Sequence, residues 1–278
     1  MYKLLEPDVM NVLILTDFSE VSDNAGKYAL DFLGSTPGQI YVLNIQDIDF
    51  NKAAPDVLEQ KMLDISRKLH KSITLFKRHT KNPNQEFHSI LSSDNLINAV
   101  RKCVDEKKID LIFIGAVSLD ARHHPLLGNH AYEVVRKIRC NIVAVPGSKK
   151  YKKPKTSILP IDYSVLTEEK IYQLIKNCSF VKDTNMTVLE IEENSPRSLK
   201  KKAVSHSLPG MLNGATVDYV DMAAPAIFSR DVLLEIQDKF DIIVVLGKNL
   251  NVCDRLLHTR YGLCSTIDNQ LPILVLHE

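Results

Sequence analysis

The sequence predicts an α/β protein made of two consecutive doubly wound parallel sheets of the Rossmann-like kind, each with five strands. Short apolar runs alternate with amphipathic helical segments, which is the pattern of parallel strands joined by crossover helices. The apolar runs are nearly continuous, as expected for strands that are covered on both faces. The same series of strands and helices begins again at residue 156, which indicates a duplicated domain.

The composition is that of a soluble globular protein without a dominant charge. Of its 278 residues, 45% are hydrophobic and 25% are charged, and the net charge is +1, so we expect no general attraction to nucleic acid. No apolar stretch reaches the roughly 20 residues of a membrane span, and the first residues lack a secretory signal pattern. The five cysteines include no Cys-x-x-Cys pair. We therefore expect reduced thiols and a cytoplasmic location.

The first half of the chain contains all the elements of one such domain. The first strand is expected at Met10–Thr16, and Ser19 is expected to cap the following helix, which Gly34 ends. Ser92 or Ser93 is expected to cap a later helix that carries Leu96 and Val104. The other predicted strands lie at 39–45, 86–91, 110–115 and 141–146, and the other helices at 55–80 and 128–138.

The second half repeats this order after a basic linker. We assign 1–147 to an N-terminal domain, 148–155 to the linker and 156–278 to a C-terminal domain. A single short basic run favours a solvated hinge over a nucleic-acid contact. Asp162-Tyr163-Ser164 repeats the pattern of Asp17-Phe18-Ser19. Strands are predicted at 156–161, 186–191, 216–220, 241–247 and 272–276, and helices at 166–179, 196–208 and 231–239.

Thr16 and Asp17 stand where the first strand ends. Open α/β sheets bind ligands outside the carboxyl ends of their strands, where the strand order reverses. Asp17 is therefore a candidate binding residue, and Asp162 is its counterpart in the second half. The structural alternative is a carboxylate that only stabilises a turn or caps a helix.

Other reactive side chains do not form a recognisable site. His123, His124 and His130 cluster near a predicted helix start but lack the further ligands that a metal site needs, so we expect no bound metal. We find no Walker lysine, no nucleophile elbow and no convincing pair of carboxylates. We therefore expect no catalytic residues, although slow incidental ATP hydrolysis stays open.

Three segments make the chain resemble a tandem universal stress protein. They are Thr16-Asp17-Phe18-Ser19, the strand 110–115 followed by Leu126-Leu127-Gly128-Asn129, and Cys140-Asn141-Ile142-Val143-Ala144-Val145-Pro146. The resemblance is strong over 10–146 and weaker over 156–277. It implies an adenine-nucleotide alpha-hydrolase-like fold in each half, a role in the stress response, and pairing of the two halves within the chain. A homodimer through other surfaces is compatible with it.

Some members of this family bind ATP through a glycine signature: Gly, two residues, Gly, nine residues, Gly, then Ser or Thr. Glycines let backbone amides approach phosphates, and a helix N-terminus favours negative charge. In this sequence Gly115 and Gly128 match the first and third glycines, Ser118 stands at the second, and Asn129 stands at the Ser/Thr position. The signature is therefore incomplete, and in the second half Gly247 alone remains in place.

The resemblance implies that adenosine lies beside Thr16 and Asp17, that Ile45 meets adenine, and that ATP with Mg²⁺ is the cofactor. Two functions stay open. The first is a non-catalytic regulator that binds ATP or another adenine nucleotide in the N-terminal half. The second is a nucleotide-free module for protein interaction or dimerisation. A protein partner is expected in both cases.

Overall fold

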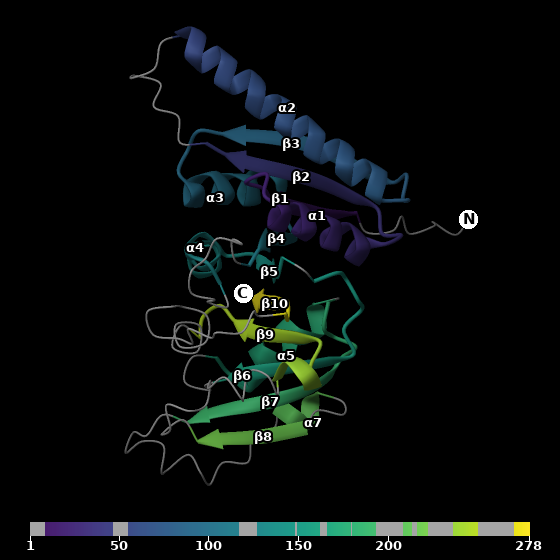
Figure 1. The fold of residues 1–278 in the computed structure, drawn as a ribbon. Helices are drawn as coiled ribbons and strands as arrows, with labels where there is room; N and C mark the ends of the chain where they lie inside the picture. Colours follow the sequence, from purple (N-terminus) through teal and green to yellow (C-terminus); the bar gives the residue numbers. More distant parts are fainter. Residues whose placement is uncertain are drawn as a thin grey trace, which may run out of the picture.

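The computed structural model describes residues 9–46, 55–116, 127–147, 149–161, 166–178, 180–192, 208–212, 216–221, 236–249 and 270–278. In the first half, strands and helices alternate as the sequence predicts (Figure 1). The strands are β1 (Met10–Leu15), β2 (Gly38–Ile45), β3 (Gln85–Ser92), β4 (Leu111–Gly115) and β5 (Asn141–Val145). The helices are α1 (Glu20–Leu33), α2 (Pro55–His79), α3 (Leu96–Lys107) and α4 (Asn129–Lys137).

The second half repeats the strands and has fewer described helices. Its strands are β6 (Thr156–Ile161), β7 (Asn185–Glu192), β8 (Thr216–Asp221), β9 (Ile242–Leu246) and β10 (Ile273–Leu276). The helices with their own bounds are α5 (Glu168–Asn177) and α7 (Leu208–Met211). The helix predicted at 196–208 lies almost entirely outside the described residues, and only the end of the one predicted at 231–239 is described, as helical residues 236–239.

The described strands form one ten-stranded sheet in the order β3-β2-β1-β4-β5-β10-β9-β6-β7-β8. The α/β fold with a parallel sheet is thereby confirmed, since all neighbouring strands are parallel within each half. Read outward from the centre, both halves have the same strand order. The two sheets join at β5 and β10, which pair antiparallel, with Leu274 opposite Val143.

Two hydrophobic cores cover the two faces of this sheet. The core under α1 and α2 includes Val12, Ile14 and Phe113, while the core under α3 and α4 includes Leu13 and Ile112. Neighbouring residues alternate between the cores because successive side chains of a strand point to opposite faces. Both cores continue across the junction of β5 and β10 into the second half.

The predicted linker is held against the first half. The Asn24 side-chain amide on α1 donates hydrogen bonds to the carbonyl oxygens of Pro146, at 3.0 Å, and Lys149, at 2.8 Å. The Tyr151 ring lies edge-on to Tyr28, with 5.1 Å between ring centroids. The linker is therefore fixed by polar and aromatic contacts rather than being only a solvated hinge, although its residues 150, 152 and 153 are exposed.

The N-terminal caps of α1 and α3 can be compared directly with the caps that the sequence predicts. Ser19 caps α1 as predicted, because its hydroxyl accepts the Ser22 backbone N–H at 3.2 Å. The predicted cap at Ser92 or Ser93 is wrong: Asn95 caps α3 by accepting the Asn98 N–H at 3.0 Å. Strand β3 extends to Ser92, which pairs with Ile45, so the helix begins later. Among the described residues, no helix is both long and apolar enough to cross a membrane.

Candidate functional site

The candidate site lies where β1 and β4, neighbours in the sheet, both end. The first turn of α1 packs directly on the end of β4, since a Cβ added to Gly115 would lie 2.7 Å from Cγ1 of Val21. The Gly128 N–H donates to the Ala116 carbonyl at 2.7 Å and so brings the start of α4 to the same place. The structure therefore gathers the ends of β1 and β4 and the start of α4 at the point where the strand order reverses.

Thr16 and Asp17 organise the turn from β1 into α1. The buried Thr16 hydroxyl accepts the Phe18 N–H at 3.0 Å and lies 3.2 Å from the Ser22 hydroxyl. The exposed Asp17 carboxylate accepts the Ser19 N–H at 3.0 Å. Burial raises the pKa of Asp17, but its hydrogen bonds with Ser19 and Ser22 together outweigh burial and hold the pKa below its ordinary value. Asp17 is therefore ionised at neutral pH.

Phe18 has a left-handed backbone, with φ of 66°. This conformation is costly for a residue with a Cβ, and such strain concentrates at functional sites. Its ring packs partly against the core under α1 and α2, and the Lys68 ammonium lies 5.9 Å from the ring centroid. Neither residue could be recognised as part of the site from the sequence, because the pattern of apolar residues marks neither the backbone angle of Phe18 nor the contact of its ring with Lys68.

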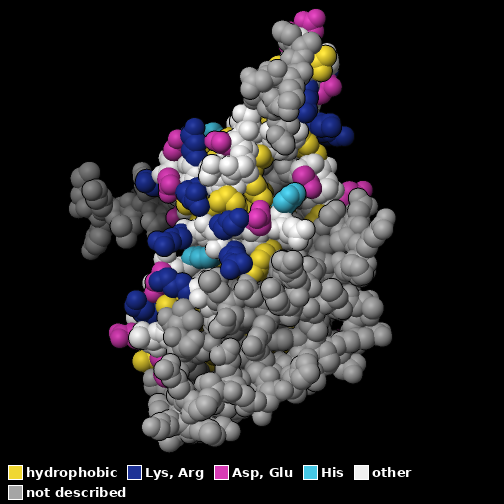
Figure 2. Space-filling view, turned by 90° about the vertical axis from the view of Figure 1, so that its left-hand side faces the viewer, with side chains coloured by type: hydrophobic (Ala, Val, Ile, Leu, Met, Phe, Trp, Pro, Cys, Tyr) yellow, Lys and Arg dark blue, Asp and Glu magenta, His cyan; other side chains and the backbone are white. Residues whose placement is uncertain are grey.

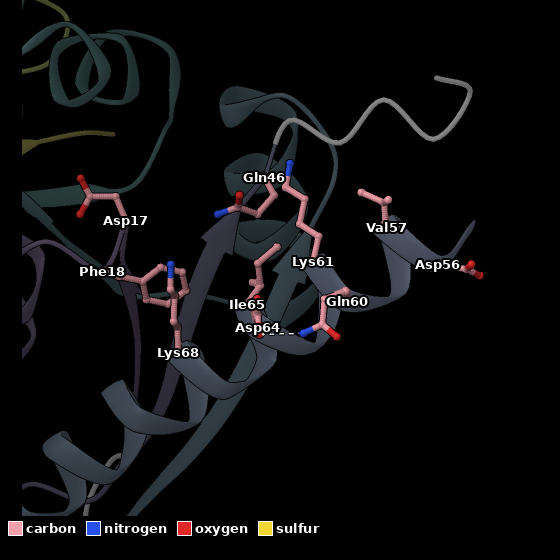
Figure 3. Close-up of a pocket in the computed structure, with 10 residues that line it drawn as sticks. All are labelled: Asp17, Phe18, Gln46, Asp56, Val57, Gln60, Lys61, Asp64, Ile65 and Lys68. Carbon is pink, nitrogen blue, oxygen red and sulfur yellow. Dashed lines mark hydrogen bonds between the residues drawn. The ribbon is translucent and has the colours of Figure 1, made fainter. Parts of the chain in front are cut away.

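A surface groove of about 700 Å³ runs from this turn along the first half of α2 (Figure 3). Asp17 and Phe18 lie at one end of it, and Asp56 and Val57 lie at the other. Its lining carries both charges: Asp17, Phe18, Gln46, Asp56, Val57, Gln60, Lys61, Asp64, Ile65 and Lys68. The groove is open and mixed in charge, so its lining does not select one sign of ligand charge.

Two amides connect the ends of β1 and β2 beside this groove. The buried Asn44 amide donates to the Thr16 carbonyl at 2.7 Å, and the Gln46 amide donates to Asn44 Oδ1 at 2.8 Å. Buried polar groups are normally hydrogen-bonded in this way. A polar residue near the end of the otherwise apolar strand β2 was the sequence signal that could have revealed Asn44.

The two signature glycines are held for different reasons. A Cβ on Gly115 would collide with Val21, so the close approach of α1 to β4 requires glycine there. Gly128 has φ of −68°, which any residue can adopt, and it occupies the N-cap position of α4 without a side-chain cap. Asn129 is exposed and is the first helical residue, so it does not cap α4.

Of the remaining predicted positions, Ile45 and His130 lie among the described residues and the others do not. Ile45 is partly buried and packs against the core under α3 and α4, on the other face of the sheet from the groove. Ser118, Asp162, His123 and His124 lie outside the described residues. His130 is exposed on α4, and the described part of the chain holds no group of three metal-binding side chains.

The described cysteines are not exposed nucleophiles. Cys103, Cys140 and Cys178 are buried and unpaired. Burial raises the pKa of Cys140 to about 12, which keeps its thiol protonated at neutral pH. Figure 2 shows the side of the molecule on which α3 and α4 lie, and there Lys and Arg side chains are mixed with Asp and Glu rather than forming a patch of one sign.

The geometry defines an α/β domain with the sheet-end layout of a small-ligand site. Residues 9–146 match the model of the universal stress protein family. These residues form a universal stress protein domain.

Three solved structures are similar to this chain, and the first of them shares its fold over nearly the whole length. A universal stress protein from Archaeoglobus fulgidus DSM 4304 is similar with a TM-score of 0.61 and 13% identity, covering 95% of this chain and 97% of that one. A universal stress protein in complex with cAMP is 22% identical over 50% of this chain and 98% of its own, with a TM-score of 0.38. The universal stress protein UspA from Lactobacillus plantarum is 21% identical over 48% of this chain and 94% of its own, with a TM-score of 0.39. The comparison with curated proteins gives no match.

Proposed function

We propose that the chain is a non-catalytic regulator in the stress response that binds an adenine nucleotide at the end of β1 and β4. The observation that carries this proposal is that the ionised Asp17 stands at the end of β1 while the start of α4 is held at the end of the neighbouring strand β4, at the switch point of the sheet. The second half, which keeps the strand order, serves as its structural partner. The protein acts in the cytoplasm with a protein partner.

The residues present can supply the contacts that a nucleotide needs. An ionised carboxylate such as Asp17 accepts hydrogen bonds from ribose hydroxyls. The first turn of α4 offers backbone amides and the positive end of a helix dipole to phosphates, and no side chain caps it at Gly128. The Gly128 amide itself is bonded to Ala116, so the amides that follow it would meet the phosphates. Mg²⁺ would enter as the counter-ion of those phosphates.

One set of observations favours the second candidate, a nucleotide-free interaction module. Asp17 already stabilises the turn before α1, and Gly115 is required by Val21. The Gly128 amide has a backbone partner. Each of these residues therefore has a structural reason to be present without any ligand, so binding must be measured directly.

The test is a calorimetric titration of the nucleotide-stripped full chain with ATP and Mg²⁺, repeated with AMP and with GTP. The variants are Asp17→Ala and Gly128→Val. The matched control is Asp110→Ala, because the Asp110 carboxylate also accepts a backbone N–H, from Asn11 at 2.7 Å, but lies before β4 at the opposite end of the sheet.

Binding near one nucleotide per chain that both site variants weaken strongly and Asp110→Ala retains would support the proposal. Losing one charge-assisted hydrogen bond to ribose predicts roughly a tenfold to hundredfold weaker affinity for Asp17→Ala. The absence of heat and of a thermal shift at millimolar ATP would refute nucleotide binding and leave the interaction module. Binding that both variants leave unchanged would show that the nucleotide sits elsewhere.

A further inference from the structure

Residues 277 and 278 lie at the seam, by which we mean the antiparallel pair of β5 and β10 that joins the two halves of the sheet. Strand β10 pairs antiparallel with β5, and His277 follows β10 directly. The His277 backbone N–H donates to the side-chain oxygen of Asn141, the first residue of β5, at 3.0 Å. His277 therefore belongs to the second half by sequence, but its backbone is hydrogen-bonded to Asn141 of the first half.

The His277 ring fills a narrow space between the halves. If Gly247 at the end of β9 had a Cβ, that atom would lie 2.2 Å from Cε1 and 2.6 Å from Nε2 of the ring. The ring therefore lies against the backbone of the second half. It also forms a hydrogen bond with the backbone of Val135 on α4, in the first half. Its Nε2 atom is buried and has no hydrogen-bond partner among the described residues.

The surroundings of the ring oppose a positive charge. Burial is the largest cause that lowers the pKa of His277, to about 4; the hydrogen bond with Val135 opposes the shift, and the positive charge of Arg139 adds to it. The neighbouring Glu278 carboxylate is engaged by Lys170, at 3.3 Å, and by Lys248. The Glu278 carboxylate, the acidic group described next to the ring, is thus already paired with lysines rather than with His277.

We propose that His277 is a proton-sensitive latch between the two halves: the neutral ring holds the seam of β5 and β10 closed, and protonation of the buried Nε2 loosens it. A neutral imidazole leaves one unpartnered acceptor in the space beside Gly247. A protonated ring instead places an unpartnered N–H and a full charge there, beside Arg139. Burying an unpaired charge is far more costly than burying an unpaired acceptor.

The pH range follows from the direction of the shift. The folded protein holds His277 less strongly protonated than the unfolded chain, whose ring titrates near 6.5. Stability is therefore lost as the pH falls below 6.5 and continues to fall until the folded ring also protonates, near 4. Between pH 7 and 4.5 the linkage amounts to about a 60-fold decrease in the folding equilibrium constant.

Amide hydrogen exchange on the full chain between pH 7 and 4.5, expressed as protection factors, tests the latch. In the wild type we expect the amides of β5 and β10 to lose protection at higher pH than those of β1 and β2. In His277→Gln, which cannot titrate in this range, the two sets should lose protection together. His79→Gln is the control, because the His79 ring lies 2.8 Å from the Asp31 carboxylate and far from the seam. This variant should behave as the wild type.

Equal loss of protection in the wild type and in His277→Gln would overturn the proposal. If His277→Gln does not fold, an NMR titration of the His277 ring in the wild-type protein tests the proposal instead. A His277 ring that titrates near 6.5 in the folded chain would refute the latch, whereas one that stays neutral well below pH 6, with seam opening as it protonates, would support it.

Discussion

Gly26 on α1 offers a direct measure of how closely the helices of the first half pack. A Cβ at this position would lie 2.2 Å from Cζ and 2.4 Å from Cε1 of Phe76 on α2. Carbon atoms at rest are about 3.5–4 Å apart, so the helices or the ring would have to move by on the order of 1 Å. The Phe76 ring is fully buried, which leaves it no open side toward which to move.

The expected magnitude for Gly26→Ala is the balance of two effects. Replacing a helical glycine by alanine stabilises a helix by about 1 kcal/mol when space allows. Overpacking a dense core costs up to about 3 kcal/mol. We therefore expect a net loss of about 2 kcal/mol in the free energy of unfolding, measured by urea denaturation with linear extrapolation.

The control and the rescue make this result specific. Gly210→Ala adds the same methyl group to α7, where nothing lies within 4 Å, and should change stability little. Phe76→Leu should recover part of the loss in the Gly26→Ala background, and a double-mutant cycle measures that coupling. If Gly26→Ala instead stabilises the chain like a substitution in an open helix, α1 and α2 do not approach as described.

Two further predictions concern the ends of α3. Lys108 follows α3 with φ of 51°, so Lys108→Gly should raise the free energy of unfolding by about 1 kcal/mol, while Lys107→Gly, inside the helix, should lower it by a similar amount. Asn95→Ala should cost about 1 kcal/mol because it removes the cap of α3, whereas Ser93→Ala should stay within about 0.5 kcal/mol. Urea denaturation measures both pairs, and equal effects within either pair would contradict the described cap.

The elements of the first half could be predicted closely because local signals agree with the tertiary fold there. Strand β1 is an apolar run, and Ser19 and Gly34 mark the two ends of α1. The prediction failed at the start of α3, where pairing of Ser92 with Ile45 lengthens β3. Pairing between distant strands competes with local capping signals, and a single sequence does not show which of them prevails.

The family resemblance implied that the two halves pair, but the strands that join the two sheets could not be predicted from the sequence. The apolar residues of β5 and β10 show that both strands are buried, but burial does not determine whether two strands pair or in which direction. The antiparallel pair of Ile273 with Ala144 is a long-range contact. For the same reason His277, which follows a short apolar strand at the end of the chain, carried no sequence signal of its position on the seam.

Part of the layout around the candidate site was predictable from the sequence, whereas the binding role of its residues stays a prediction. Asp17 and Gly128 were predicted because strand ends and glycines are visible in sequence, and the structure brings their surroundings together. The positive φ of Phe18 and the amide of Asn44 depend on contacts with α2 and β1. Such contacts arise only when distant segments meet, so no local pattern of residues announces them.

The pairing of the two halves gives the second half a role that needs no ligand. The apolar residues of β5, including Ile142 and Val143, are fully buried in the joined sheet. An unpaired strand edge of this kind promotes aggregation. Strand β10 covers that edge, whereas β3, at the end of the described sheet, carries polar residues such as Glu86 and Ser89. Covering this edge is therefore a structural role for the sheet of the second half that does not depend on a ligand signature.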